Sequence, residues 1–305
     1  MKMQQAKPFV KWAGGKTQLL HEVEKLLPDW ISLSKKVTYV EPFIGGGAVL
    51  FWLLQKYPNI KRAIINDINK DLIGVYKTIK QNPEELISLL YSIQQDYISK
   101  NENDRKDYFL QQRDRFNSKD NDIVFNSALF IFLNRTCFNG LYRVNSKGQF
   151  NVPHGKYANP KICDKENIFA CHEILRKVEI SDGDFEKTIQ YAGKDTIYYL
   201  DPPYKPISLT SSFTAYSKES FDDKDQIRLS KFCDSISEKG SVFILSNSDV
   251  NSHEQKNLFF DDLYSSYQIY RVSATRMISA NASNRGTLNE LMVSNNVNNL
   301  SYKYK

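Results

Sequence analysis

A strand, a glycine-rich turn, a helix and a second strand follow one another early in the chain. Val37 to Val40 has strand composition, and residues 41–47 read Glu-Pro-Phe-Ile-Gly-Gly-Gly. Ala48 to Gln55 has the composition of a helix, and Arg62 to Ile65 resembles a second strand that stops at Asn66-Asp67. Such a βαβ unit makes the two strands parallel, because the helix crosses over between them. We therefore expect an α/β fold.

The middle of the chain follows a different pattern. Between Asp71 and Asn134 apolar residues recur at helical spacing, and two alternating pieces, 141–144 and 149–152, then predict a β-hairpin. Strand character returns at residues 178–180, 196–200, 241–245 and 290–293. We expect a catalytic core of residues 1–69 and 163–305, an inserted helical and hairpin domain of residues 70–162, and a frayed Asn-rich stretch at 295–299.

The charge distribution indicates a polyanionic partner. The net charge is +6, and no Asp or Glu occurs from Ile123 to Cys163. Acids in that stretch would repel phosphate, so their absence favours a nucleic-acid surface over an ordinary solvated one. The cations of the stretch are Arg135, Arg143, Lys147, Lys156 and Lys161.

Other sites and locations are disfavoured by the sequence. The four cysteines form no Cys-x-x-Cys pair, and Cys163, Cys171 and His172 do not have the spacing of a zinc site. No apolar run is long enough to cross a membrane, and the first residues lack an apolar signal segment. We expect a cytoplasmic monomer with reduced thiols, no membrane span and no metal.

The glycine-rich turn favours an adenosyl ligand with a positive charge. Gly45 and Gly47 allow backbone to approach a ligand, and Asp67 ends the next strand, where an acid can hold a ribose. The dinucleotide order Gly-x-Gly-x-x-Gly is absent, and the turn begins with Glu41, whose carboxylate suits a cation better than a pyrophosphate. S-adenosylmethionine, with its sulfonium and amine, fits better than NAD.

A second glycine turn, Lys11-Trp12-Ala13-Gly14-Gly15-Lys16, lies upstream. Lys16 is suited to pair with a ligand carboxylate, and Trp12 to cover a ligand face. A plain helix-capping loop is an equally good interpretation of these residues. The segment is not a P-loop, because the spacing Gly-x-x-x-x-Gly-Lys is absent.

The strand at 196–200 runs directly into Asp201-Pro202-Pro203-Tyr204, at the end of a strand where α/β sheets bind ligands. An aryl amine such as adenine N6 is a poor nucleophile, because its lone pair is delocalised into the ring. Asp201 can accept one N6–H and the carbonyl of Pro202 the other, which directs the lone pair at a methyl donor. Tyr204 offers a flat face to the base. An adenine within a duplex must be flipped out to reach these groups.

Together these motifs resemble one family, the Dam and DpnII-type (D12 class, group alpha) N6-adenine DNA methyltransferases. The matching segments are KWAGGK at 11–16, EPFIGGGA at 41–48, INDIN at 65–69, FNGLYRVNSKGQFNVPHGKY at 138–157, DGDF at 182–185, DPPY at 201–204 and FTAY at 213–216. They occur in the family's order over nearly the whole chain. The resemblance implies a seven-stranded Rossmann-like, S-adenosylmethionine-dependent methyltransferase core with an inserted target-recognition domain, acting on bacterial or phage double-stranded DNA.

The resemblance also assigns roles to single residues. It implies that the cofactor is lined by Trp12, Lys16, Asp67 and Asp201, and that Asp184 and Phe185 meet its adenine. It further implies that the 213–216 segment orders over the flipped base.

For residues 138–157 the resemblance implies that the hairpin reads GATC. Arg143 would contact guanine, Leu141 and Pro153 would contact a thymine methyl, and Phe138 would wedge into the base stack. Further DNA contacts are implied for Asn139 beside that wedge, Lys11 at flanking DNA, Lys147 at a phosphate, and Lys156. Because Lys156 stands where some members carry arginine, we expect a relaxed preference for flanking bases.

Three other functions are compatible with parts of the pattern. A dehydrogenase would need nicotinamide binding, for which the glycine order is wrong. A methyltransferase of RNA or of a protein amide is a second alternative; the amide enzyme would have no use for an acid-free basic hairpin. The third is a DNA-binding module without catalysis, against which the intact Lys16, Asp67 and Asp201 argue.

Overall fold

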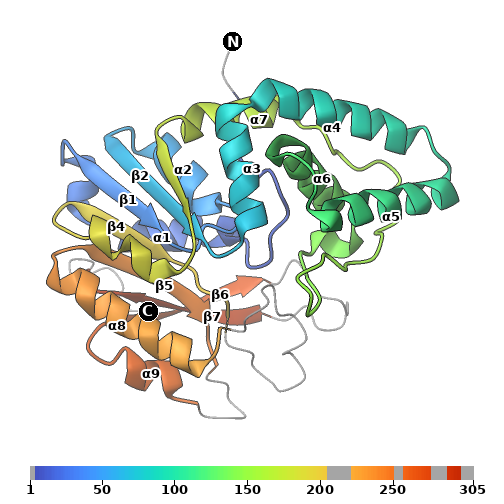
Figure 1. Cartoon of the computed structure of the whole chain (residues 1–305). Coiled ribbons are helices and arrows are strands. Elements are labelled where there is room, and N and C mark those ends of the chain that lie inside the picture. The colour runs from blue at the N-terminus through green and yellow to red at the C-terminus, as the bar shows by residue number, and fades with distance from the viewer. Residues whose placement is uncertain (1–3, 205–220, 251–256, 276–286, 297–305) are drawn as a thin grey trace.

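The computed structural model describes residues 4–204, 221–250, 257–275 and 287–296. Its centre is one seven-stranded sheet with the order β3-β2-β1-β4-β5-β7-β6 (Figure 1). The strands are β1 (Val37–Glu41), β2 (Ile60–Asp67), β3 (Val178–Asp182), β4 (Thr196–Leu200), β5 (Val242–Ser248), β6 (Gln268–Thr275) and β7 (Thr287–Ser294). Strands β1 to β5 pair in parallel, whereas β7 runs antiparallel to both β5 and β6. This is the Rossmann-like α/β fold expected from the sequence.

Both faces of the sheet are covered by helices, so its central strands are apolar on both sides. Tyr39 packs into one hydrophobic cluster and its neighbour Val40 into the other, because successive side chains of a strand point to opposite faces. The first cluster includes residues of α1 (Leu20–Leu26), α2 (Ala48–Lys56) and α7 (Lys165–Leu175). The second includes residues of α8 (Asp223–Glu238) and α9 (Phe259–Leu263).

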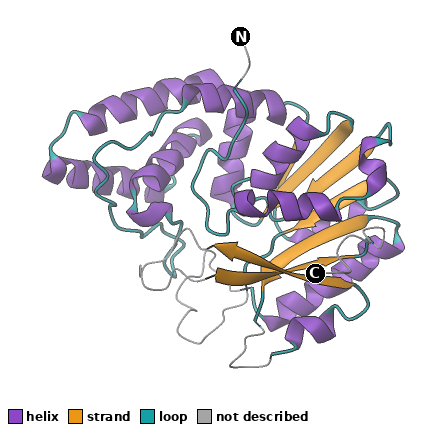
Figure 2. Cartoon of the chain, turned by 180° about the vertical axis from the view of Figure 1, so that it is seen from behind, coloured by secondary structure: helices purple, strands orange, loops and turns teal. Residues whose placement is uncertain are grey.

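The inserted region consists of four helices that gather beside one end of the sheet (Figures 1 and 2). They are α3 (Lys70–Gln81), α4 (Pro83–Ile98), α5 (Glu102–Ser118) and α6 (Ile123–Thr136). Capping residues separate them: Pro83 occupies the first turn of α4, and the side chains of Asn101 and Asp122 cap α5 and α6. Helix α6 is buried on most sides, and α3 contacts both α6 and the strands β2 and β3. The inserted helices thus share one hydrophobic cluster with the sheet.

Several sequence expectations need correction. The hairpin is not a pair of strands, because only the isolated bridges Cys137–His154 and Val144–Phe150 form in it. Strand β6 was missed, since its residues alternate weakly and it lies at the sheet edge. The Asn-rich stretch is not frayed at its start: the Asn295 amide donates to Ser241 O (2.8 Å) and the buried Asn296 amide to Leu26 O (3.1 Å). Residues 213–216 lie outside the described residues.

Candidate functional site

Three carboxylates meet at one edge of the sheet. Glu41 ends β1, Asp67 ends β2, and Asp201 follows β4 directly. Because β1 pairs in parallel with both β2 and β4, the carboxyl ends of these strands are neighbours. The sequence motifs at 41–47, 65–69 and 201–204 are therefore brought together as predicted.

The glycine-rich turn lies directly under Trp12. Gly45 has a left-handed φ of 47°, and a Cβ there would stand 2.8 Å from Trp12 Cδ1, so only glycine fits. The Tyr76 hydroxyl donates to Gly45 O (3.0 Å), and Gly45 N donates to Asp67 Oδ2 (3.1 Å). Gly47, with φ 73°, caps the start of α2. The hydrogen bonds with Tyr76 and Asp67 thus fix the backbone of the turn.

The acids of this edge have raised pKa values. Burial raises the pKa of Asp67 to about 6, against the backbone N–H groups of Asn69 and Gly45, which lower it. Burial likewise raises the pKa of Glu41 well above its usual value, although the Tyr39 hydroxyl donates to Glu41 Oε2 (2.7 Å). The charges of Asp201 and Asp67 add to this rise. An edge built this way favours a positively charged neighbour.

Lys16 is the cation of the site, and it is paired within the chain. Its ammonium lies 2.9 Å from Asp201 Oδ1 and donates to Gly14 O (2.6 Å), with only 3% of its side chain exposed. Burial lowers the pKa of Lys16, but attraction to Asp201 and other acids leaves it raised overall. Burial raises the pKa of Asp201 to about 6, against the attraction of Lys16. The contact of Lys16 with a ligand carboxylate stays a prediction.

Tyr204 lies beside this ion pair. Its ring centroid is 4.6 Å from Lys16 Nζ, and its hydroxyl donates to Glu290 Oε2 (2.8 Å), which also accepts from the Ser246 hydroxyl (3.3 Å). The sequence indicated the strand around 290 but not the role of its acid. A carboxylate directly before the buried run Leu291-Met292-Val293 was the signal that could have identified it.

Asp184 and Phe185 lie just beyond the end of β3. The Asp184 carboxylate pairs with Arg228 (2.8 Å) and caps the short helix that follows, and Phe185 is buried against Phe43 and Phe232. Their position near Asp67 follows from the β2–β3 pairing, since Gly183 N donates to Asp67 O (3.0 Å). Their contact with an adenine ring stays a prediction.

The predicted DNA-reading side chains lie on the hairpin, apart from Lys11 in the N-terminal segment, and are largely accessible. Phe138 is 45% exposed, and Arg143, Lys147, Pro153, Lys156 and Lys11 are also exposed. Asn139 adopts a left-handed φ of 55°, and Leu141 is half-buried. The Arg143 side chain donates from Nε to Asn151 Oδ1 (2.8 Å) and from Nη2 to Asn151 O (3.3 Å). These two bonds fix the orientation of its guanidinium group. Asn151 was not predicted as a site residue.

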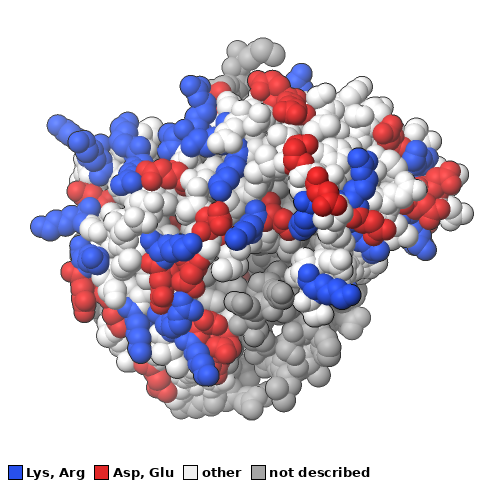
Figure 3. Space-filling view, viewed as in Figure 1, with Lys and Arg blue, Asp and Glu red and all other residues white. Residues whose placement is uncertain are grey.

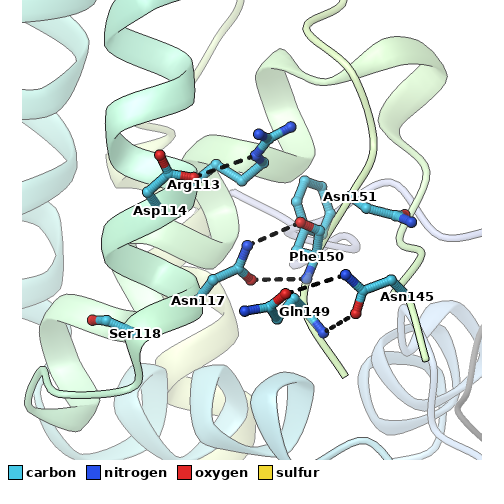
Figure 4. A pocket seen from close by; sticks show the side chains of 8 residues that line it. All are labelled: Arg113, Asp114, Asn117, Ser118, Asn145, Gln149, Phe150 and Asn151. Carbon is cyan, nitrogen blue, oxygen red and sulfur yellow. Dashed lines mark hydrogen bonds and ion pairs between the residues drawn. The ribbon is translucent and has the colours of Figure 1, made fainter. Parts of the chain in front are cut away.

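Side-chain amides reinforce the few backbone hydrogen bonds of the hairpin, such as Asn145 N to Gln149 O (2.9 Å) and Asn151 N to Arg143 O (3.1 Å). Asn117 of α5 pairs with the backbone of Phe150 through two hydrogen bonds of 3.0 and 2.8 Å, as Figure 4 shows. Asn145 closes the turn by accepting from Lys147 N and Gln149 N. These residues line a polar recess of about 410 Å³ between α5 and the hairpin. The hairpin is thus docked onto the inserted helices.

The acid-free stretch contributes fewer free cations than its sequence implied. Arg135 is half-buried and donates to Phe9 O (2.8 Å), so it is a structural residue. Lys161 pairs with Asp164 (2.7 Å) and Lys156 with Glu102 (3.5 Å). On the face in Figure 3, basic and acidic side chains are intermixed over the described surface. Arg143 and Lys147 are the exposed cations of this stretch that form no ion pair among the described residues.

The hairpin and the glycine turn touch through two aromatic rings. Tyr142, beside Arg143, stacks on Trp12 with ring centroids 5.6 Å apart, and its hydroxyl donates to Asp71 (3.1 Å). Trp12 in turn packs on Gly45. The side-chain amide of Asn134 accepts from Lys11 N and donates to Lys11 O, both at 2.8 Å. These bonds fix the backbone of Lys11, directly before Trp12. The sequence did not indicate this contact.

The sheet order, the glycine turn and the Asp-Pro-Pro-Tyr motif at the end of β4 define a Rossmann-like methyltransferase. No group of three or more His, Cys, Asp or Glu placed to hold a metal occurs in the described residues. Within the same residues, no helix is both long and apolar enough to cross a membrane.

The chain belongs to the D12 class N6 adenine-specific DNA methyltransferases, whose family model matches residues 12–278. It is 46% identical to the type II methyltransferase M.MjaIII of Methanocaldococcus jannaschii over 95% of this chain and 99% of that protein. It is 41% identical to the type II methyltransferase M1.LlaDCHI of Lactococcus lactis, covering 95% of each. The DNA adenine methylase of Escherichia coli is 30% identical, again over 95% of each chain.

Proposed function

We propose that this chain transfers a methyl group from S-adenosylmethionine to N6 of adenine in double-stranded DNA, within GATC, after flipping the adenine out of the helix. Membership in the adenine-N6 DNA methyltransferases supplies the reaction class. The observation that carries the finer proposal is the placement of Asp201. Its carboxylate follows β4 at the acid-lined edge, pairs with the buried Lys16, and lies beside the half-buried Tyr204.

The cofactor site suits a ligand of mixed charge. The proposed lining is Trp12, Lys16, Glu41, Gly45, Gly47, Asp67, Asp184, Phe185 and Asp201. When bound, S-adenosylmethionine supplies an electrophilic methyl group on a positively charged sulfur. A bound cation would lower the raised pKa values of Glu41 and Asp67 and so favour their charged forms. Trp12 packs on the glycine turn, because the absence of a Cβ at Gly45 leaves room for its ring.

The target amine would be held by Asp201 and Pro202. The Asp201 carboxylate accepts one N6–H and the Pro202 carbonyl accepts the other, which keeps the nitrogen lone pair directed at the methyl group. Asp201 need not be a strong base, because the amine proton becomes acidic only as the new bond forms. Tyr204 provides the flat face on which the extruded base stacks.

Recognition is assigned to residues 70–162, which we propose act as the target-recognition domain. Arg143 would contact the guanine of the site, and Leu141 and Pro153 a thymine methyl. Phe138, which is 45% exposed, would enter the base stack, with Asn139 beside it. Lys11, Lys147 and Lys156 would approach the backbone or flanking bases.

The test is to incubate the protein with unmethylated plasmid and isotopically labelled S-adenosylmethionine, and then to map modified bases. Label on adenine N6 within GATC is the expected result. Label on adenine in another sequence would overturn the assignment of the recognition site alone. Label on cytosine, or none, would overturn the proposed reaction.

A further inference from the structure

Glu290 lies in the site but takes no part in the proposed methyl transfer itself. It sits on β7, opposite Ser248 of β5, and its Oε2 accepts from the Tyr204 hydroxyl (2.8 Å) and the Ser246 hydroxyl (3.3 Å). Its hydrogen-bond partners among the described residues are these two hydroxyl groups, and its charge also attracts the Lys16 ammonium, whose pKa it helps to raise. Its side chain is half-buried, and a carboxylate is costly to bury unless it is hydrogen-bonded or paired.

The bond to Glu290 fixes the orientation of the Tyr204 ring. The backbone holds one end of the side chain directly after Pro203, and Glu290 holds the hydroxyl at the other end. The Lys16 ammonium, 4.6 Å from the ring centroid, occupies one face of the ring. A stacking base would therefore have to use the opposite face of the ring. Without the bond at the hydroxyl, the ring would be free to turn about its side-chain torsions.

We propose that Glu290 is a positioning residue for methyl transfer, which acts through the Tyr204 hydroxyl to present the ring face opposite Lys16 to the target adenine. This inference deepens the proposed function and rests on the proposed stacking role of Tyr204. Glu290 does not touch the reacting atoms. Its effect should therefore appear in turnover and in the state of the flipped base, while binding of the duplex is largely kept.

The experiment compares four variants: Glu290→Ala, Glu290→Gln, Tyr204→Phe, and the double variant Tyr204→Phe with Glu290→Ala. Each is assayed for kcat and KM on a GATC duplex, and for 2-aminopurine fluorescence at the target position. Glu179→Gln is the matched control, because Glu179 also lies on the sheet but pairs with Arg62 at the surface (2.6 Å). Thermal unfolding and binding of S-adenosylhomocysteine show whether each variant is folded.

We expect Glu290→Ala to lower kcat by about 10- to 100-fold with KM changed less than threefold, as for loss of a hydrogen bond to a charged group. Tyr204→Phe keeps the ring but loses the same bond, so the double variant should be no slower than the slower single variant. Glu290→Gln keeps an acceptor oxygen and should recover most of the rate. The fluorescence of both single variants should change in the same direction.

Three results would overturn the proposal: a Glu290→Ala rate within twofold of the wild type, losses that multiply in the double variant, or a Glu290→Gln rate as low as that of alanine. The last result would mean that the reaction uses the charge of the carboxylate and not its bond to Tyr204. If Glu290→Ala does not fold, Tyr204→Phe and Glu290→Gln still decide the question. Failure of the proposed function is distinguishable, because the wild type would then not methylate adenine.

Discussion

The acid-lined edge of the sheet and the hairpin are built in opposite ways. At the edge, Glu41 and Asp67 end strands that are bonded to neighbours on both sides, and Lys16 is almost fully buried. In the hairpin, two isolated bridges and the amides of Asn117, Asn145 and Asn151 hold exposed side chains. The edge is therefore fixed by a continuous ladder, whereas the hairpin relies on isolated bridges and side-chain amides.

The two regions should therefore fail in different ways. Damage at the edge should reduce turnover on every sequence, because all substrates share the same chemistry. Damage in the hairpin should change which sequences are methylated, or how binding depends on salt. The contact between Tyr142 and Trp12 is the place where the two regions meet.

Asp201→Asn should cause the largest loss. It removes the charge that accepts the N6 proton and leaves the buried Lys16 without its partner (2.9 Å). We expect single-turnover methylation to fall by at least about 10²- to 10³-fold on all duplexes, the usual effect of removing one such electrostatic group. A rate within threefold of the wild type, in protein of unchanged melting temperature, would contradict the role of Asp201.

Arg143→Ala should change discrimination and not chemistry. If its fork contacts guanine, the preference for that base pair should fall by about 1–3 kcal/mol, or roughly 5- to 150-fold. Initial rates on the cognate duplex and on its three variants at that base pair should then converge. An even loss on all four duplexes would make Arg143 a phosphate contact.

The pH dependence should come from the edge alone. Burial raises the pKa of Asp201 to about 6, so this carboxylate becomes protonated, and cannot accept, as the pH falls through that value. We expect kcat/KM to fall below about pH 6, by tenfold or more per pH unit, because the pKa of Asp67 is also about 6 and protonation of either acid removes a charge from the site. The Arg143→Ala variant should show the same midpoint. A midpoint that shifted in the Arg143→Ala variant would contradict the view that the hairpin has no part in the pH dependence.

Lys147→Ala should have the smallest effect. Lys147 is exposed at the hairpin turn, where a side chain meets phosphate more readily than a base edge. We expect a weaker affinity for all sequences alike, and a plot of log affinity against log salt that is shallower by about 0.9. Titrations at several salt concentrations, with cognate and non-cognate duplexes, measure this slope. A loss confined to the cognate duplex would make Lys147 a base-reading residue.

The sequence predicted the edge better than the hairpin, for physical reasons. Strands such as β4 are apolar on both faces and end at polar motifs, so the residues that follow them meet at a predictable place. The hairpin has no such constraint, because its docking depends on side chains distant in sequence, such as Asn117 and Phe150. Arg135 was misjudged for the same reason: its partner, Phe9, is far away in the chain.

Glu290 escaped prediction because it reaches the site from a strand with reversed direction. The rule that places site residues at the carboxyl ends of strands holds for parallel strands, and β7 runs antiparallel to β5. Its acid therefore enters the site from the opposite end of its strand. The strand itself was visible in the sequence, but the direction in which it would insert was not.

The strand order at the β6 edge also sets an order of events during synthesis. Strand β7 lies between β5 and β6, yet the ribosome makes it after both. Until it emerges, β5 has an open edge and the Tyr204 hydroxyl has no carboxylate to meet. At about 5–20 residues per second, translation to this point takes roughly 15–60 s. A nascent chain can thus assemble its glycine turn and its Lys16–Asp201 pair well before the site is complete.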